Sequence, residues 1–199
     1  MSKKKTVEFT GQPFPSVQQI EGELARISQA PKKRSPLKTL ILVLVVSAAV
    51  VVLITSLLCP VIKVSGNSMQ PTLNNDDVAL AVKTNNLKQG DICCFYNNNN
   101  LFVRRVIGIP GDIIDISEDG SVSVNGETLD ETYITEKARG DCDIDFPFTV
   151  TESTYFVLGD NRPISKDSRI SDIGCVPKDR IVGKLIVTVW PVYSVRIVG

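Results

Sequence analysis

The chain has 199 residues, and its 22 basic and 22 acidic side chains give a formal net charge of zero. It contains no histidine, which excludes a Ser-His-Asp triad and any histidine-ligated metal site. Its five cysteines include no Cys-x-x-Cys pair, so we expect no zinc site.

The N-terminal segment, residues 1–37, predicts a basic cytoplasmic tail. It holds few large apolar residues and two basic clusters, at residues 3–5 and 32–34. Such a composition is typical of a disordered tail, and we expect only one short helix in it, near residues 17–28. Residues 1–38 carry eight Lys or Arg against three acidic residues, so this part of the chain is positively charged.

Residues 38–59 predict a transmembrane helix. Residues 40–58 are nineteen positions without a charge, and at about 1.5 Å per residue such a helix spans about 28 Å, close to the hydrocarbon thickness of a bilayer. A removable signal peptide is disfavoured, because the apolar segment begins late and Pro60 would follow the cleavage point. We therefore expect a retained single-pass anchor in contact with membrane lipid.

The charges on the two sides of this anchor predict its orientation. Only Lys63 and Lys83 follow it within 25 residues, so the positive-inside rule places the tail in the cytoplasm and residues 60–199 outside it. This outer part has fourteen basic and nineteen acidic residues, which argues against nucleic acid as a partner. Outside the cytoplasm a disulfide between Cys142 and Cys175 is an open alternative to free thiols.

Residues 60–199 predict an all-β domain without a helix of three turns. The runs that favour strands are rich in Val, Ile, Phe and Tyr; they are residues 78–82, 91–96, 101–107, 113–116, 121–124, 155–158 and 181–190. Turn residues separate these runs, among them the asparagines at 97–100 and Asn125-Gly126. The asparagine run is most simply a hairpin loop.

Three segments of this domain carry residues that could do chemistry. Residues 65–73 read SGNSMQPTL, residues 101–112 bring two adjacent arginines into a Gly/Pro turn, and residues 155–169 open into a polar loop. Loops at strand ends commonly build sites, although a hydrogen-bonded structural loop explains each one equally. Ser68 follows Cys59 by nine positions, at most about 30 Å of extended chain, so it stays near the membrane surface.

Taken together, these segments resemble the type I signal peptidases, membrane-anchored serine endopeptidases that remove signal peptides from exported proteins. The resemblance rests on SGNSMQPTL at 65–73, GDICCF at 90–95, RRVIGIPGD at 104–112 and GDNRPISKDSR at 159–169. The single anchor is similar to the Gram-positive form of the family. The related fold of the self-cleaving SOS repressors fits less well, because this chain has an anchor and no DNA-binding half.

The resemblance implies roles for particular residues. Ser68 matches the nucleophile, whose backbone N–H would also help to bind the oxyanion, and Ser165 matches the serine that orients the general base. Gly66 stands where some relatives have a serine that assists the oxyanion hole, and Met69 matches a residue beside the bound peptide. The supporting residues implied by the family are Arg105, Asp160, Asn161, Arg162, Asp167 and Arg169.

One position departs from the family pattern: Arg104 stands where the family has the general-base lysine. Apolar surroundings can lower the pKa of a lysine enough for it to take a serine proton. A guanidinium has a pKa above about 12, and bringing it to neutrality would cost roughly 8 kcal/mol. We therefore expect Arg104 to hold the Ser68 hydroxyl without deprotonating it. The other candidate bases are Lys63, Lys83 and Lys166, none of which matches the family's base.

The function implied by the resemblance is removal of signal peptides from exported preproteins. Cleavage would follow small residues in an Ala-x-Ala-like pattern at the outer membrane–water interface, through an acyl-enzyme and without a cofactor. We expect the substrate to bind as an extended strand beside residues 61–66 and 78–82. The alternative is a catalytically impaired or inactive paralogue that binds signal peptides or regulates an active sister enzyme.

Overall fold

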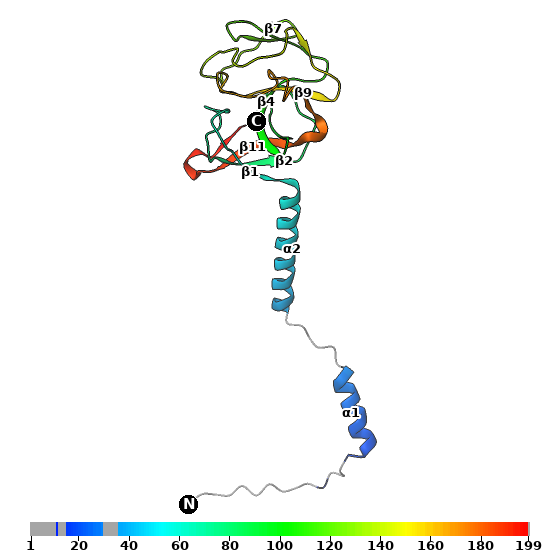
Figure 1. Cartoon of the computed structure of the whole chain (residues 1–199). Helices are drawn as coiled ribbons and strands as arrows, with labels where there is room; N and C mark the ends of the chain where they lie inside the picture. The colour runs from blue at the N-terminus through cyan, green and yellow to red at the C-terminus, as the bar shows by residue number, and fades with distance from the viewer. Residues whose placement is uncertain (1–10, 12–14, 30–35, 199) are drawn as a thin grey trace, which may run out of the picture. The chain divides into compact units, whose positions relative to one another are not determined.

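The computed structural model describes Gly11, residues 15–29 and residues 36–198, and the chain divides into two units, Met1–Ala49 and Val50–Gly199. The basic clusters at 3–5 and 32–34 lie outside the described residues. Figure 1 shows two helices, α1 (Val17–Gln29) and α2 (Pro36–Leu58), followed by a β domain. The domain boundaries at 37/38 and 59/60 remain predictions.

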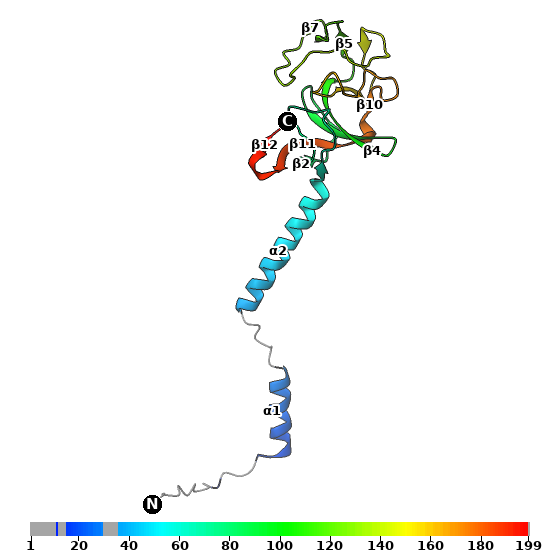
Figure 2. The same cartoon turned by 60° about the vertical axis from the view of Figure 1, so that its left-hand side comes forward.

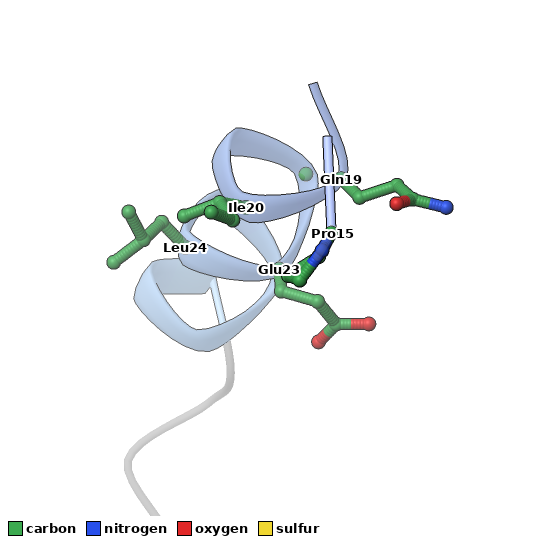
Figure 3. Close-up of a pocket in the computed structure, with 6 residues that line it drawn as sticks. Pro15, Gln19, Ile20, Glu23 and Leu24 are labelled. Atoms are coloured by element: carbon green, nitrogen blue, oxygen red, sulfur yellow. The ribbon is translucent and has the colours of Figure 1, made fainter. Parts of the chain in front are cut away.

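Helix α1 confirms the short helix expected near residues 17–28. It begins with a capping box, in which the Gln19 N–H donates to the Ser16 hydroxyl and the Ser16 N–H donates to the Gln19 side chain. Figure 3 shows Ile20 and Leu24 projecting from one side of the helix and Gln19 and Glu23 from the other. This amphipathic helix borders a hollow of about 700 Å³, whose described lining residues, between Pro15 and Leu24, include no group suited to nucleophilic catalysis.

Helix α2 has the length and composition of a membrane span. Its 23 residues begin at Pro36, a residue favoured at the first helical position, and residues 36–55 form the one described helix long and apolar enough to cross a bilayer. Two of its described hydroxyl side chains, those of Ser47 and Thr55, donate to helix carbonyls one turn earlier. The helix therefore presents little unsatisfied polarity to lipid.

The larger of two sheets is antiparallel and carries most of the core. Its strands lie in the order β1-β2-β11-β3-β4-β9-β10, with β12 paired to β11. Their bounds are Val61–Lys63 (β1), Val78–Val82 (β2), Ile92–Asn97 (β3), Asn100–Gly108 (β4), Thr154–Leu158 (β9), Val176–Pro177 (β10), Ile181–Trp190 (β11) and Arg196–Ile197 (β12).

A smaller sheet packs over the end of β4. It contains β5 (Ile113–Ile116), β6 (Val122–Val124), β7 (Glu127–Thr128) and β8 (Phe148–Thr149), in the order β7-β6-β5-β8. Gly108 permits the two sheets to meet, since a Cβ there would lie 2.6 Å from the Ile114 Cδ1. Buried Ile107, Ile114, Val150 and Phe156 fill the space between them.

The structure confirms the mainly β fold and all seven expected strands. The strands that the sequence did not predict, apart from β1, have only two residues each, which is too short for a recognisable apolar run. Asn98 and Asn99 have φ of 47° and 64° and form the two-residue hairpin loop expected for the asparagine run. After residue 60 the described chain contains only two short 3₁₀ helices, η1 (Lys178–Arg180) and η2 (Val192–Ser194). All five cysteines are free, so Cys142 and Cys175 form no disulfide.

Candidate active site

Ser68 lies in a turn whose apolar side chains pack into the core of the domain. Met69 and Leu73 are both buried, and the Leu73 N–H donates to the Met69 carbonyl at 2.8 Å, which closes the turn after Ser68. Before it, Gly66 has φ +88° and donates its N–H to the Asn75 side chain at 2.8 Å. A left-handed φ favours glycine, which accounts for this residue in SGNSM.

The Ser68 side chain borders a cleft of about 290 Å³. One wall comes from the chain that leaves β1 and the other from the first half of β4. The lining residues are Lys63, Val64, Ser65, Ser68, Met69, Asn100, Leu101, Phe102, Val103 and Arg104. Strand β2 does not line it, and the prediction that a peptide adds beside Val78–Val82 is wrong, because β2 is paired with β1 on one edge and β11 on the other.

Arg104 is buried and points at the hydroxyl of Ser68. Its Nη1 donates to the Ser68 Oγ at 2.8 Å and to the Val103 carbonyl at 2.6 Å. Its Nε and Nη2 donate to the Lys166 carbonyl at 2.9 Å and 2.6 Å. All of these acceptors are neutral. Burial lowers the pKa of Arg104, and the nearby Asp167 opposes that shift.

This geometry makes Arg104 a hydrogen-bond donor to Ser68. A guanidinium carries only donors and does not deprotonate in proteins, so it has no lone pair with which to take the Ser68 proton. It can, however, stabilise negative charge on the Ser68 oxygen, because the Nη1–Oγ contact of 2.8 Å is charge-assisted. Arg104 therefore favours the alkoxide electrostatically without being able to generate it.

Ser165 is the one described residue with a buried side-chain polar atom that lacks a hydrogen-bond partner. Its Oγ packs close to the Ser68 backbone: a Cβ on Gly159 would lie 2.1 Å from the Ser165 Oγ and 2.6 Å from the Ser68 carbonyl oxygen. Arg104 donates to the carbonyl of the next residue, Lys166, rather than to this hydroxyl. A buried hydroxyl without a partner is costly. The Ser165 hydroxyl could accept a hydrogen bond from a different donor side chain at position 104.

Arg105, the next residue on β4, lies in a charged and fully paired environment. Its Nε and Nη2 donate to the two carboxylate oxygens of Asp160 at 2.8 Å and 2.6 Å, and its Nη1 donates to the Gly90 carbonyl. Thr72, at the end of the Ser68 turn, donates its hydroxyl to the same carboxylate. The Tyr133 ring lies 4.0 Å from the Arg105 guanidinium carbon, so this ion pair is enclosed on several sides.

Two further buried ion pairs fix the loop 159–169. Arg169 donates to both carboxylate oxygens of Asp167 at 2.8 Å, and Asp167 in turn accepts the Gly159 N–H at 3.0 Å. Arg162 pairs with Glu131 at 2.5 Å, and both side chains are 1% exposed. Buried charges of this kind require such partners.

Asn161 ties this loop directly to the turn that bears Ser68. The Asn161 N–H donates to the Ser68 carbonyl at 3.0 Å, and its side chain donates to the Asn67 carbonyl at 3.1 Å. The hydrogen bond from Thr72 to Asp160 joins the same two segments, so three hydrogen bonds link the turn at 65–73 to the loop at 159–169. The structure thus brings every expected site residue into one connected region.

Sequence reasoning missed Glu131, Tyr133 and Thr72. Glu131 and Tyr133 come from the long connection between β7 and β8, where no motif or periodicity distinguishes them. Thr72 lies inside SGNSMQPTL, but nothing in that motif indicates a contact with position 160. Many acidic residues could have paired with Arg162, and nothing in the sequence distinguished Glu131 among them.

None of the three candidate lysines takes the place of a base in the described structure. Lys63 borders the cleft, but its amine pairs with Asp76 at 2.8 Å. Lys166 offers Arg104 its backbone carbonyl while its side chain is exposed, and Lys83 is exposed as well. The described residues contain no group of three or more acidic or cysteine side chains placed to hold a metal ion.

Comparisons with known proteins identify the family of this chain. The family model described as "Signal peptidase, peptidase S26" matches residues 37–190. The chain is 36% identical to signal peptidase IB of Staphylococcus aureus over 148 residues, covering 64% of this chain and 76% of that one. It is 30% identical to signal peptidase I of Bacillus licheniformis over 184 residues, covering 84% and 96%. A crystal structure of a signal peptidase I from Enterococcus faecalis V583 is 30% identical, covers 50% of this chain and 97% of that one, and superposes with a TM-score of 0.40.

Proposed function

The chain belongs to the signal peptidase family, peptidase S26, and from this membership we propose that it removes signal peptides from exported preproteins with Ser68 as nucleophile. Membership makes it a serine endopeptidase of the signal peptidase I type, whose substrates carry signal peptides. The observation that carries the role of Ser68 is its place in the cleft, with a cationic donor 2.8 Å from its Oγ.

The acyl transfer needs three things of these residues. Ser68 Oγ attacks the scissile carbonyl, its proton leaves, and the carbonyl oxygen becomes an oxyanion that the Ser68 backbone N–H helps to bind. This intermediate collapses to the acyl-enzyme as the C–N bond breaks and the leaving amine takes a proton from water. A second water then hydrolyses the ester and frees Ser68. Arg104 lowers the energy of the Ser68 alkoxide through its charged contact but does not accept the proton. The proton therefore passes to water or hydroxide in the open cleft, and we expect slow turnover at neutral pH.

The cleft accounts for small side chains in the substrate. An extended peptide lying between residues 63–65 and 100–103 meets Met69 beneath it, which is 1% exposed and held by the core. A rigid floor of this kind rejects large side chains by overlap. A Cβ on Gly66 would meet no heavy atom within 4 Å, so the left-handed φ, not lack of space, favours glycine there.

The anchor places this chemistry at a membrane. We propose that α2 spans the bilayer with the basic tail in the cytoplasm and residues 60–199 outside, as the positive-inside rule favours. Ser68 follows the helix end at Leu58 by ten residues, which keeps the cleft near the outer surface, where a signal peptide ends.

A second function is favoured by one observation, the guanidinium at position 104. With Ser68 hydrogen-bonded and no base beside it, the cleft could retain a signal peptide without cutting it, as a binding or regulatory paralogue would. The similarity to signal peptidases gives this alternative no support over cleavage. The two functions differ in whether any product forms.

The test uses the full chain, purified in detergent, and a preprotein with an Ala-x-Ala site. We expect a product of the mature mass, formed slowly by the unmodified chain, not formed by Ser68→Ala, and unaffected by Ser123→Ala, a matched change on β6 in the other sheet. Product from Ser68→Ala at the same rate would contradict the assignment of the nucleophile. Retention of the uncut preprotein, with cleavage only in Arg104→Lys, would establish the binding function instead.

A further inference from the structure

Arg104 differs from the other buried arginines of the described structure in having no ion pair. Four arginines are buried, and each of the other three pairs with a buried carboxylate. These ion pairs join Arg105 with Asp160, Arg162 with Glu131, and Arg169 with Asp167. Because a buried charge is costly unless a group of opposite charge accompanies it, Arg104 carries a charge that its own chain leaves unbalanced.

The carboxylates nearest to Arg104 do not supply the missing charge. Asp167 and Asp160 are the two whose charge reaches it, and each already accepts two hydrogen bonds from its own arginine, at 2.6 or 2.8 Å. The charge of Arg169 also opposes that of Asp167 at this position. Cys93, opposite Arg104 on β3, adds no charge at neutral pH, because burial raises the pKa of its thiol. Arg104 and the groups around it therefore carry a net positive charge.

Ser68 presents two hydrogen-bond donors beside this charge. Its hydroxyl accepts a hydrogen bond from the Arg104 Nη1 at 2.8 Å, and neither this hydroxyl nor the Ser68 N–H donates to another described residue. A serine hydroxyl can accept one hydrogen bond while it donates another. Two donors without acceptors, backed by a guanidinium, form an arrangement that binds anions.

The cleft indicates which kind of anion fits this arrangement. Figures 1 and 2 both show β4, which carries Arg104, between β11 and the smaller sheet marked by β7, and the cleft of about 290 Å³ follows the first half of β4. Its lining includes the apolar side chains of Met69, Leu101 and Phe102. A hydrated inorganic anion gains nothing from these walls, whereas a peptide buries its own apolar side chains against them. A peptide whose last residue lies beside Ser68 places its terminal carboxylate against the two donors.

We propose that this cleft binds peptides through their C-terminal carboxylate, with the Ser68 N–H and hydroxyl as donors and Arg104 as the balancing charge. Because the Ser68 Oγ lies 2.8 Å from the Arg104 Nη1 and an O–H···O contact is about 2.7 Å long, the carboxylate lies about 5 Å from the guanidinium. The ligand class is the one that signal-peptide cleavage releases, a peptide ending in a small residue. The inference deepens the proposed function and rests on it for the direction in which the peptide lies.

Binding of this carboxylate has a consequence for turnover. The cleaved peptide is charged at the group beside Ser68, whereas the uncut precursor is neutral there, so the product binds more tightly than the substrate at this group. Differences in affinity at one site appear mainly in the dissociation rate, and the cleaved peptide therefore leaves slowly. A neutral amine at position 104 would exert no such attraction, so the retention of product is specific to a side chain that stays charged.

The test compares two short labelled peptides that end in Ala-x-Ala and differ only in the last group. One ends in a carboxylate and the other in alaninol, whose CH2OH is neutral. Neither has a bond to cut after the last residue, so the outcome does not depend on whether the chain cleaves preproteins. With the full chain in detergent, fluorescence anisotropy should show the carboxylate bound about 10–100-fold more tightly, the effect of a unit charge about 5 Å away in a partly solvated site. Equal affinities would overturn the proposal.

Two variants identify the source of this preference. Arg104→Met should abolish it, whereas Lys166→Gln, which removes an exposed and screened cation of the adjoining loop, should retain it. The opposite pattern would overturn the role of Arg104. The comparison of the two peptides needs only the unmodified chain, so it remains decisive if Arg104→Met fails to fold.

Competition with small anions separates a peptide site from a general anion site. Acetate and inorganic phosphate should displace the labelled carboxylate peptide only at concentrations far above that of the unlabelled peptide. Displacement by either anion at the same concentration as the peptide would mean an adventitious ion only and would overturn the proposal.

Discussion

Two adjacent arginines on β4 lie in environments of opposite character. Arg105 donates to both oxygens of the Asp160 carboxylate and stacks on Tyr133, so its charge is balanced. Arg104 donates only to neutral oxygens, those of Ser68, Val103 and Lys166. Successive residues of a strand face opposite sides of the sheet, which separates the two pockets although they lie one residue apart.

The difference indicates that the charge of Arg105 stabilises the fold, whereas the charge of Arg104 acts on the nucleophile. The pocket of Arg105 contains a full set of acceptors for a guanidinium and has no spare polar atom in the described structure. The pocket of Arg104 leaves the Ser165 hydroxyl without a partner and aims a donor at the nucleophile. The pocket of Arg105 supplies acceptors that match a guanidinium. The pocket of Arg104 also holds a guanidinium, but it leaves the Ser165 hydroxyl without a hydrogen bond.

The largest effect is expected when Arg104 is replaced by lysine. A buried amine beside Ser68 and Ser165 would have a pKa lowered by desolvation and could accept the Ser68 proton, and general base catalysis contributes about 10²–10⁴-fold. We expect preprotein cleavage to rise by that factor in Arg104→Lys. Arg105→Lys is the matched control and should not raise it. An equal rate in unmodified protein and Arg104→Lys would show that Arg104 does not limit turnover.

The next largest effect is on stability, where we expect Arg105 to matter more than Arg104. Arg105→Met leaves the buried Asp160 carboxylate unpaired, which costs about 3–5 kcal/mol. Arg104→Met leaves only neutral acceptors behind and should cost about 1–2 kcal/mol. Denaturant unfolding followed by circular dichroism measures both free energies.

A companion variant sharpens that comparison. Asp160→Asn in the Arg105→Met background removes the uncompensated charge and should recover much of the lost stability. Should Arg104→Met prove as destabilising as Arg105→Met, the distinction between the two pockets would not hold.

The smallest effect concerns Ser165. Its Oγ has no partner in the described structure, so Ser165→Ala should change stability by less than about 1 kcal/mol and leave the cleavage rate of the unmodified chain unchanged. In the Arg104→Lys background the same substitution should lower the rate, because the hydroxyl then orients the amine. A rate loss in the unmodified background alone would contradict this account of the hydroxyl.

Much of the fold was predictable because it depends on local patterns. Short apolar runs and turn residues predicted seven strands, and Asn98-Asn99 formed its hairpin because asparagine tolerates a positive φ. Strands such as β10 and β12 have two residues each and depend on long-range pairing, so no local pattern predicts them. Strand β2 itself was predicted from its apolar run, but its pairing with β1 on one edge and β11 on the other was not.

The candidate site was predictable to the extent that its residues stand in motifs. Ser68, Arg104 and Asp160 were identified by the family resemblance of their segments. The contact between Ser68 and Arg104 was expected because that resemblance puts Arg104 at the position of the general base. The partnership of Arg162 with Glu131 was not predictable, because it joins two loops whose approach only the packed domain determines. The orphaned Ser165 hydroxyl was likewise visible only in the structure.

The pH dependence of cleavage tests the central claim, that Arg104 remains a charged donor, most directly. Burial lowers the pKa of Arg104 from a high starting value, and below that pKa the guanidinium stays protonated. The rate in the unmodified chain should therefore rise with pH across the neutral range without levelling off, as water and hydroxide take the Ser68 proton. In Arg104→Lys the rate should level off once pH exceeds the lowered pKa of the amine. A plateau near neutral pH in the unmodified chain, absent in Ser68→Ala, would mean that a base within the protein acts on Ser68 and would contradict the account.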